Sequence, residues 1–592
     1  MIAPMRKYSF LIYHQEYNRF LEDIRELGVV DIVEKENRLD EETIQKLDQL
    51  KQINKAIDFL KRRNVEAGKP DEETGGIKVM EDVLSRRNQL ENLEQKINTL
   101  KKEIHHVAPW GDFSWDTIEK LKKAGLTLRF FVVSEKKFNP EWKKQYNAGI
   151  ISIDQSKAHF IVIQEGDEPI DIEAGEVKPP RRSLSAVNRE KKQAEEQRDK
   201  INRELDKYAA TAIPALQKAA KKTGQEAEYN KVLINTIEEA EGKVKVLEGF
   251  VPVDKRKPLD TYLEKKKILF ITRKPFPEES PPIELKNGRF ARLFEPIAKL
   301  FAMPSYRELD LTPLFAPFFM LFFGFCLGDA GYGLLFIIVG FIVKPRLKPK
   351  MKPIVTLVQF LGLGTLIFGV LTGTFFGMDL LQKDLPVLES VKSFMLNSEQ
   401  SFYLALIIGA FQILFGIGVH AVNRFRRYGF LYALPQIGWL MLLPGLGIYF
   451  GLDGLELPGT IMMSAGIALI LFWSDPKANI LSRIGVGLWD LYNITGIFGD
   501  VLSYIRLFAL GVSSAILGFV INDISMSINQ GLPYAGPVLM VIFLVIGHTA
   551  NIFISSLGAF VHPMRLTFVE FYKNAGFSGG GKEYKPFKTK LK

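Results

Sequence analysis

The chain has 592 residues, of which 47% are hydrophobic and 24% charged, and its formal net charge is +10. This length allows several domains, and the single cysteine, Cys326, excludes an intramolecular disulfide framework or a cysteine metal cluster. Most charged side chains fall in residues 1–300, whereas 301–592 hold long apolar runs. The positive charge does not indicate a nucleic-acid partner, because the C-terminal basic clusters adjoin apolar runs, as cytoplasmic loop anchors do.

The first 300 residues predict two α/β lobes. Residues 7–13 indicate a strand, 15–27 carry apolar residues at helical spacing, and VVDIV after Gly28 indicates another strand, which together predict a small β-α-β unit. Residues 126–164 hold three further strand-like runs. We therefore expect one lobe from 1–40 with 240–300 and a second lobe from 105–180.

Between these lobes the sequence predicts an antiparallel coiled coil of 41–104 with 183–240. Leucine and isoleucine recur every three or four residues along otherwise charged segments, which is typical of such a seam. No segment near Met1 is long and apolar enough for a secretory signal, so this half is expected in the cytoplasm.

We expect no catalytic residue, cofactor or metal in the chain. It contains no G-x-x-x-x-G-K-[ST] loop, so it should not bind ATP phosphates through a P-loop. The pair His105 and His106 is better read as a solvated helix end than as a metal site.

Residues 301–592 predict a polytopic membrane domain. A single span needs about 20 residues, and three of the apolar runs are far longer than that. The runs are 311–343, 354–377, 401–422, 430–450, 457–474, 484–521 and 535–572.

Loop charges set the number of crossings. The stretch 344–352 is strongly basic and should lie inside the cell. If the run 311–343 crossed once, residues 1–300 would lie outside, so we expect a hairpin that turns at Asp329. This gives about eight helices, with the N-terminal half and the C-terminus in the cytoplasm of a cell-membrane protein. The last two helices, at roughly 55–60 Å against a ~30 Å hydrocarbon core, must be tilted or extend beyond it.

Two arginines lie within apolar runs, where charge is costly and indicates function. Arg506 lies near the centre of 484–521, and Arg565 lies in 535–572. The alternatives are an internal salt bridge between Arg506 and Asp500, and snorkelling of Arg565 to the cytoplasmic surface.

Helical spacing places further polar residues beside these arginines. On the helix of Arg506, Asn493 and Asp500 share one face and Arg506 and Ser513 another, with Ser503 between them. In the last run a polar stripe, read as an aqueous path, contains His548, Asn551, Ser555, Gly558, His562 and Arg565. Glu570 is a further channel-lining candidate. Gly409, Gln412, Gly416 and His420 share a face of 401–422, where close packing is the favoured reading. Asp329 and His420 are structural candidates.

Several motifs resemble subunit a, or subunit I, of the V-type and A-type rotary ATPases. They include YRELDLTPLFAPFFMLFFGFCLGDAGYGLL (306–335), LIFGVLTGTFFG (366–377), GDVLSYIRLFAL (499–510) and FVHPMRLTFVEFY (560–572), and the resemblance extends over essentially the whole chain. It implies that Arg506 and Arg565 face the ionisable carboxylates of a rotating proteolipid ring. It also implies half-channels for H⁺ or Na⁺ and a cytoplasmic stator arm.

The same resemblance implies the partners of the chain, although the sequence differs from the family at a few positions. The partners would be the proteolipid c/K ring, peripheral-stalk E/G-type subunits, a central-stalk d/C-type subunit, the soluble ATPase sector and membrane lipid. The chain itself would be a subunit without a nucleotide site. Eukaryotic members carry a histidine where Ser514 stands and a glutamate where Ser555 stands, so their exit pathway cannot be copied here. Leu311 stands where the family often has a proline.

Two other classes compete with this reading. A secondary transporter fits intramembrane charge and broken helices, but no internal repeat is visible. A membrane anchor for a coiled-coil scaffold explains the rod but leaves the two arginines and the polar stripe unexplained. Co-purification with a proteolipid ring and soluble ATPase subunits distinguishes the three.

Overall fold

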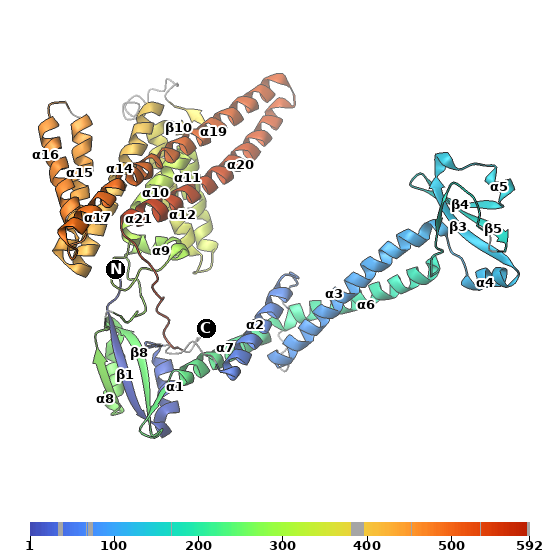
Figure 1. The fold of residues 1–592 in the computed structure, drawn as a ribbon, viewed down its shortest axis with the longest axis horizontal. Coiled ribbons are helices and arrows are strands. Elements are labelled where there is room, and N and C mark those ends of the chain that lie inside the picture. Colours follow the sequence, from blue (N-terminus) through green and yellow to red (C-terminus); the bar gives the residue numbers. More distant parts are fainter. Residues whose placement is uncertain are drawn as a thin grey trace. The chain divides into compact units, whose positions relative to one another are not determined.

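The computed structural model describes residues 1–33, 40–66, 68, 75–166, 169–276, 278–380, 396–451, 453–532 and 534–588. The chain divides into two compact units. One unit combines 1–33 with 237–588, and the other comprises 34–236 with the last residues of the chain. Figure 1 shows a helical arm with a small sheet domain in the second unit, and a sheet lobe with a helical bundle in the first.

The arm is built from two helix pairs. Helix α3 (Gly76–Val107) packs against α6 (Leu184–Thr211), and α2 (Glu41–Lys61) packs against α7 (Ile213–Ile234). A narrow buried seam that includes Ile53, Val83 and Leu205 joins them. The predicted long helices are thus each divided in two, and Pro214 opens α7 because proline suits the first turn of a helix.

The lobe at the far end of the arm is a four-stranded antiparallel sheet in the order β4-β5-β3-β6. Its strands are β3 (Leu126–Ser134), β4 (Ala148–Asp154), β5 (Lys157–Glu165) and β6 (Gly175–Val177), with helices α4 (Trp115–Lys123) and α5 (Trp142–Gln145). Phe131 and Phe160 stack in its core. The ends of the lobe meet where Arg182 pairs with Glu103, at 3.6 Å.

The lobe of the first unit is a five-stranded antiparallel sheet. Strand β8 (Val244–Pro252) lies between β1 (Met5–Tyr13) and β2 (Asp31–Ile32). The predicted order of strand, helix and strand is present, because α1 (Tyr17–Leu27) joins β1 and β2, and β8, a strand distant in sequence, lies between the two. The remaining elements are β7 (Ile237–Glu239), α8 (Arg256–Lys265) and β9 (Leu269–Arg273).

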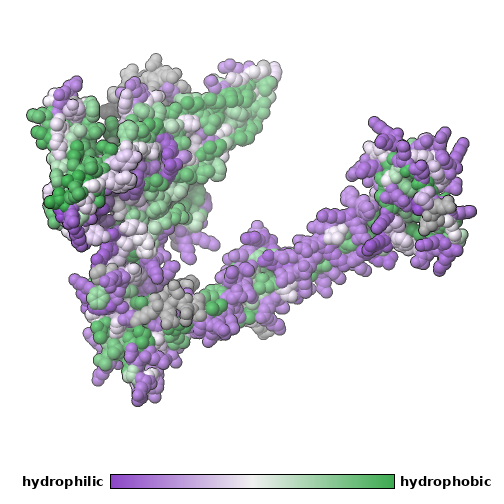
Figure 2. Space-filling view, in the orientation of Figure 1, coloured by the Kyte–Doolittle hydropathy of each residue, from purple (hydrophilic) through white to green (hydrophobic). Residues whose placement is uncertain are grey.

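Six helical stretches of the described chain are long and apolar enough to cross a membrane. They are α12 (Lys352–Thr372), α14 (Ser398–Tyr428), α15 (Leu434–Gly451) with the short turn before it, α16 (Glu456–Trp473), the stretch 480–531 and the stretch 536–574. The shorter α10 (Thr312–Leu327) and α11 (Ala330–Val343) precede them. Figure 2 shows an apolar surface over these helices and a polar surface over the arm.

The helices α10 and α11 form the predicted hairpin. Phe325 near the end of α10 contacts Phe368 near the end of α12, with ring centroids 5.0 Å apart. Helix α11 then returns along α12 until Gly340 lies beside Gln359. Gly328 ends α10 in the left-handed conformation, at φ 53°, which glycine adopts without steric cost. Asp329 begins α11 by accepting the N–H groups of Gly331 and Tyr332.

The run 484–521 is not the single helix that the sequence predicts. It lies within three helices, α17 (Ile480–Tyr492), α18 (Ile494–Leu502) and α19 (Ile505–Gly531), which are interrupted at Asn493 and at Ser503–Tyr504. Helix α20 (Gly536–Arg565) packs beside α19 and continues through a π-helical segment (Leu566–Phe571) and α21 (Tyr572–Asn574). In Figure 1, α19 and α20 run obliquely to α12 and α14.

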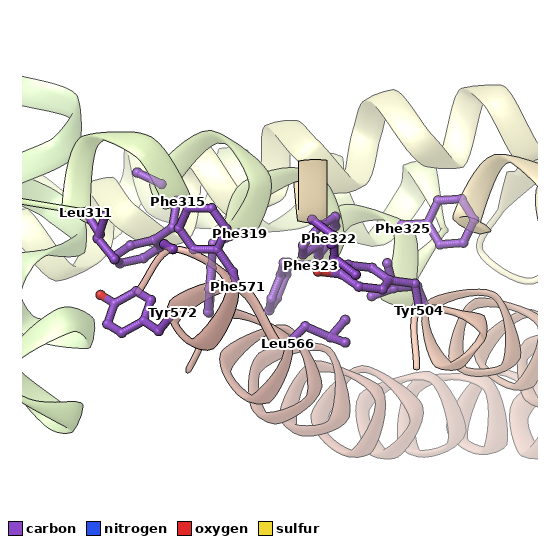
Figure 3. Packing of buried hydrophobic residues seen from close by; sticks show 14 of the residues in the cluster. Leu311, Phe315, Phe319, Phe322, Phe323, Phe325, Tyr504, Leu566, Phe571 and Tyr572 are labelled. Atoms are coloured by element: carbon purple, nitrogen blue, oxygen red, sulfur yellow. The ribbon is translucent and has the colours of Figure 1, made fainter. Parts of the chain in front are cut away.

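An aromatic core joins the hairpin to the last helices (Figure 3). Phe315, Phe319 and Phe322 of α10 are fully buried, as are Tyr504 and Phe571. Tyr572 contacts Phe315, with ring centroids 6.1 Å apart. Helix α9 (Arg289–Phe301), which precedes the hairpin, adds Phe294 to this core.

The C-terminal tail returns from the bundle to the sheet lobe. The Ser578 N–H donates to the buried Glu308 carboxylate at 2.8 Å. Further on, the Ile283 N–H donates to the Lys582 carbonyl at 2.7 Å, and the Phe587 N–H donates to the Val30 carbonyl at 2.8 Å. We call residues 577–588 the C-terminal strap, because they bond in turn to the base of the bundle and to the lobe.

Candidate functional site

The junction between α18 and α19 is anchored at mid-height of the bundle. Tyr504, at this junction, is fully buried, and its hydroxyl donates to Gln412 Oε1 at 2.6 Å. Gln412 lies near the middle of α14, which is itself long enough to span a membrane. The Tyr504 ring also contacts Phe322 of α10, with centroids 5.7 Å apart (Figure 3). Arg506 follows two residues later, so it too lies near the middle of the apolar layer.

Arg506 lies on a strip of α19 whose other members, Ala509 and Ser513, are exposed. Among the described residues no carboxylate lies within 4.0 Å of its guanidinium, and Nη1 is buried without a hydrogen-bond partner. Asp500, the partner considered from the sequence, instead contacts Lys573 Nζ at 3.0 Å and accepts from Asn574 Nδ2 at 2.9 Å. The guanidinium thus forms no salt bridge within the described chain, and Glu570 interacts with it only at longer range.

The outer half of the α20 stripe is a partly buried hydrogen-bond network. His548 bonds through one ring nitrogen to the Tyr332 hydroxyl at 2.7 Å and through the other to Asn522 Oδ1 at 3.1 Å. Asn551 donates to the same tyrosine at 3.0 Å and accepts from Ser555 Oγ at 2.8 Å. These bonds tie α20 to α11 and α19, so at this height the polar residues also serve helix packing.

The inner half of the stripe lies beside Arg506. His562 is within electrostatic reach of both Arg506 and Arg565, and a Cβ at Gly558 would meet Leu510 of α19. Arg565 is exposed and ends α20, one residue before the π-helical segment. Pro563 in the preceding turn cannot donate a backbone hydrogen bond, which favours such an irregularity.

A second set of polar side chains lies near Arg506, on the side toward the C-terminal strap. Glu570, in the π-helical segment, is 2% exposed, and its Oε2 has no partner among the described residues. Asn574 joins this segment to α18, because its amide donates both to the Glu570 carbonyl at 2.7 Å and to Asp500. We call Asp500, Glu570, Lys573 and Asn574 the inner polar cluster.

A cavity of about 350 Å³ lies on the opposite side of Arg506. Polar residues from the ends of α12 and α14 line its outer part, and α19 lines its inner part. The polar lining consists of Thr372, Thr374, Asp379, Asn397, Ser398 and Ser401. On α19 the lining begins at Phe508, two residues from Arg506. We call it the outer cavity.

Of the other predicted site residues, Asp329 and Ser503 bond to backbone groups, and His420 packs against a glycine. Asp329 accepts the N–H groups of Phe376 and Gly377, at 2.9 and 2.8 Å, in addition to those of its own helix. The ring of His420 lies against Gly576 in the strap region. Ser503 donates to the Gly499 carbonyl at 3.0 Å, and Ser513 is exposed. Within the described ranges no group of three His, Cys, Asp or Glu side chains could hold a metal ion.

Sequence reasoning missed Lys573, Asn574, Tyr332, Asn522 and the role of Tyr504. Each acts through a partner many positions away along the chain, as Asn574 does with Asp500 and Tyr504 with Gln412. Gln412 was noted only as a member of a packing face. A polar residue on an apolar face was its one available signal, because a buried amide needs a hydrogen-bond partner.

Comparison with known proteins gives one consistent result. No family model matches the chain. It is 27% identical to "V-type ATP synthase subunit I" of Borreliella burgdorferi over 100% of both chains. It is 28% identical to "A-type ATP synthase subunit I" of Methanocaldococcus jannaschii over 84% of this chain and 74% of that protein. It is 25% identical to the V-type subunit I of Chlamydia pneumoniae over 98% and 96% of the two chains.

Among solved structures, the cytoplasmic N-terminal domain of a subunit I, homolog of subunit a of V-ATPase, matches 45% of this chain and 100% of that one. The identity is 16% and the TM-score is 0.20, which is too low for an argument from that fold. The full-length relatives carry the assignment, and the membrane-spanning helices agree with it. The chain is a membrane protein that belongs to the subunit I, or subunit a, family of V-type and A-type rotary ATPases.

Proposed function

We propose that the chain provides two half-channels for H⁺ or Na⁺ against a rotating proteolipid ring and links this membrane sector to the peripheral stalks. The observation that carries the proposal is the Arg506 guanidinium, which lies at mid-height on the exposed strip of α19 with no described carboxylate within 4.0 Å. An uncompensated charge at that depth is costly. An ionisable carboxylate on a passing ring helix would compensate it without fixing it in place.

The two polar regions beside Arg506 support two separate access routes. The outer cavity would admit the ion as far as Phe508, and the inner polar cluster would lead from Glu570 toward the strap side. Arg506 lies between them, so an ion could pass from one to the other only on the ring. An opposite charge close by favours the ionised carboxylate, so Arg506 would release the bound ion as each ring site arrives.

The predicted partners and orientation extend this proposal. The basic stretch 344–352 would keep the start of α12 and the sheet lobe in the cytoplasm. The arm and its far lobe would contact the E/G-type peripheral stalks, and a d/C-type central-stalk subunit and the soluble ATPase sector would complete the complex. Arg565, exposed and nearer the cytoplasmic side, would be a secondary contact of the ring carboxylates.

The test is ATP-driven ion uptake by the assembled complex in reconstituted vesicles. We expect Arg506→Ala to abolish uptake and Arg506→Lys to impair it severely, because lysine can lose its proton when desolvated and arginine does not. Arg565→Ala should have a smaller effect, since water can partly replace an exposed guanidinium. Assembly should persist in all three variants, as checked by co-purification of the ring. Near-normal pumping by an assembled Arg506→Ala complex would refute the proposal.

A further inference from the structure

A groove of about 790 Å³ opens between α9, α11, α12 and α20, apart from the proposed ion path. Its walls are almost entirely apolar. Leu293 of α9, Leu357 and Leu361 of α12, and Ile552 and Phe560 of α20 contribute to them.

Water is a poor occupant of this groove. An ordered water needs two to four polar partners, which apolar walls do not offer. An empty groove would forfeit the dispersion contacts of every side chain that lines it. Both α12 and α20 lie in stretches that can span a membrane, so lipid acyl chains are the hydrocarbon at hand.

The charge at one end of the groove selects among lipids. Arg292 of α9 is the charged side chain of the lining, and it is exposed. Its guanidinium donates to the Asn287 carbonyl at 3.3 Å, and no carboxylate of the described chain lies within 4.0 Å of it. Glu295, one turn further along α9, is engaged by the Asn287 side chain at 3.1 Å instead.

Further positive charge lies beside the α12 wall of the groove. Lys352 directly precedes Pro353, which lines the groove, and Lys344 Nζ contacts Gln359 of α12 at 3.4 Å. Basic pockets between membrane helices bind anionic headgroups, and guanidinium groups pair strongly with phosphate. A zwitterionic headgroup would bring its own cation into this positive field.

We propose that the groove is a binding site for an anionic glycerophospholipid, with one acyl chain along α12 and α20 and the phosphate on Arg292. The lipid completes the packing between α20, which carries His562 and Arg565, and the α10–α12 group. The inference does not depend on the path of the ion.

A photoreactive phosphatidylglycerol, with a diazirine at the end of one acyl chain, tests the site in the purified complex within phosphatidylcholine vesicles. We expect cross-links in 353–361 and 549–560 at a density at least tenfold above that on α15 and α16. Unlabelled phosphatidylglycerol should compete at least tenfold better than phosphatidylcholine.

Two matched variants separate the headgroup contact from general surface charge. Arg292→Gln should abolish the preference for phosphatidylglycerol, whereas Arg289→Gln, on the same helix but outside the groove lining, should retain it. Leu357→Trp should lower cross-linking with Arg292 intact, because the indole narrows the groove.

Four outcomes would overturn the inference. Cross-linking no denser than on α15 and α16 would make the groove ordinary lipid-facing surface. Equal competition by phosphatidylcholine, or equal effects of the two arginine variants, would remove the headgroup selectivity. Cross-links on the isolated chain that vanish in the complex would assign the groove to a protein helix.

Discussion

At the scale of single residues, Arg506 differs from its polar neighbours in its hydrogen bonds and ion pairs. Asp500 bonds to Lys573 and Asn574, and Tyr504 bonds to Gln412. In contrast, no described carboxylate lies within 4.0 Å of the Arg506 guanidinium, and its Nη1 has no hydrogen-bond partner. Removing water from a charge costs several kcal/mol per ion. Glu570 Oε2 is likewise without a hydrogen-bond partner among the described residues, and we propose that a partner outside the chain meets the arginine charge.

The hydroxyl of Tyr332 offers a test of the outer network. Tyr332→Phe removes the bonds to both His548 and Asn551, while Asn551 keeps the Ser514 carbonyl at 3.2 Å. We expect a loss of roughly 1–3 kcal/mol, because a buried partner is left unsatisfied. Thermal inactivation of the assembled complex measures it. Tyr492→Phe, at a position 65% exposed, is the control and should change little. Equal inactivation of the two variants would contradict the network.

The sequence located the charged residues of the site but not their surroundings. Arg506 and Arg565 stand out because charge is rare in apolar runs, a signal that needs no tertiary information. Helical spacing placed His548, Asn551 and Ser555 on one face, yet spacing alone cannot distinguish a water-lined face from one bonded to α11. That distinction depends on Tyr332, which is 216 positions from His548.

At the scale of elements, charge proved a better guide than length. The basic loop after α11 predicted the α10–α11 hairpin, since only an even number of crossings puts residues 1–300 and this loop both in the cytoplasm. In the structure, Gly328 and Asp329 form the turn of the hairpin. Length predicted one helix across 484–521, where the structure has breaks at Asn493 and Ser503–Tyr504. Neither break contains proline, so no local signal marked them. The position of β8 between β1 and β2 could not be predicted for a similar reason, because β8 is more than 200 positions from β2.

One buried carboxylate holds the start of the strap. Glu308 accepts the N–H groups of Ser305, Ser578 and Gly579, at 2.8, 2.8 and 3.2 Å, and Arg427 lies 3.0 Å from it. Burial alone would raise the pKa of Glu308, but these N–H donors outweigh it and hold the pKa below its usual value. The carboxylate therefore stabilises the strap above its unfolded-state pKa, and this stabilisation is lost as the pH falls through the lowered folded-state value.

Glu308→Gln should accordingly loosen the strap. Hydrogen bonds to a charged group contribute about 1.5–3 kcal/mol, so amide exchange in 578–587 should rise by at least about tenfold near neutral pH. The difference from the wild type should shrink as the pH is lowered toward the folded-state pKa of Glu308. Hydrogen–deuterium exchange at matched pH measures both. Glu583→Gln, in the exposed pair with Lys299, is the control. Unchanged exchange in Glu308→Gln would show that the strap is held by its other bonds.

At the scale of the whole molecule, the orientation of the chain in the membrane is the first property to test. The proposal places residue 350 in the cytoplasm and the α15–α16 loop outside, because positive loops stay inside. With buried Cys326 replaced by alanine, Lys350→Cys should react with an impermeant thiol reagent only after the cells are opened. Asp453→Cys should react in intact cells. Labelling of position 350 from outside would refute the eight-helix arrangement.

The function of the sheet lobe at the far end of the arm is the second property to test. Its two ends are held together by the Arg182–Glu103 pair and by a bond from the Ser185 N–H to Asp112 at 3.2 Å, so a short Gly/Ser linker can replace 113–180 without parting α3 from α6. If the lobe binds a peripheral stalk, the shortened arm cannot resist the torque of rotation. ATP hydrolysis should then continue while ion uptake falls several-fold, with membrane insertion unchanged. The control carries the same linker in the β4–β5 turn at Gln155–Ser156 and keeps the lobe. Simultaneous measurement of hydrolysis and uptake in vesicles decides the matter, because coupled pumping by the shortened complex would mean that the stalks are held elsewhere on the chain.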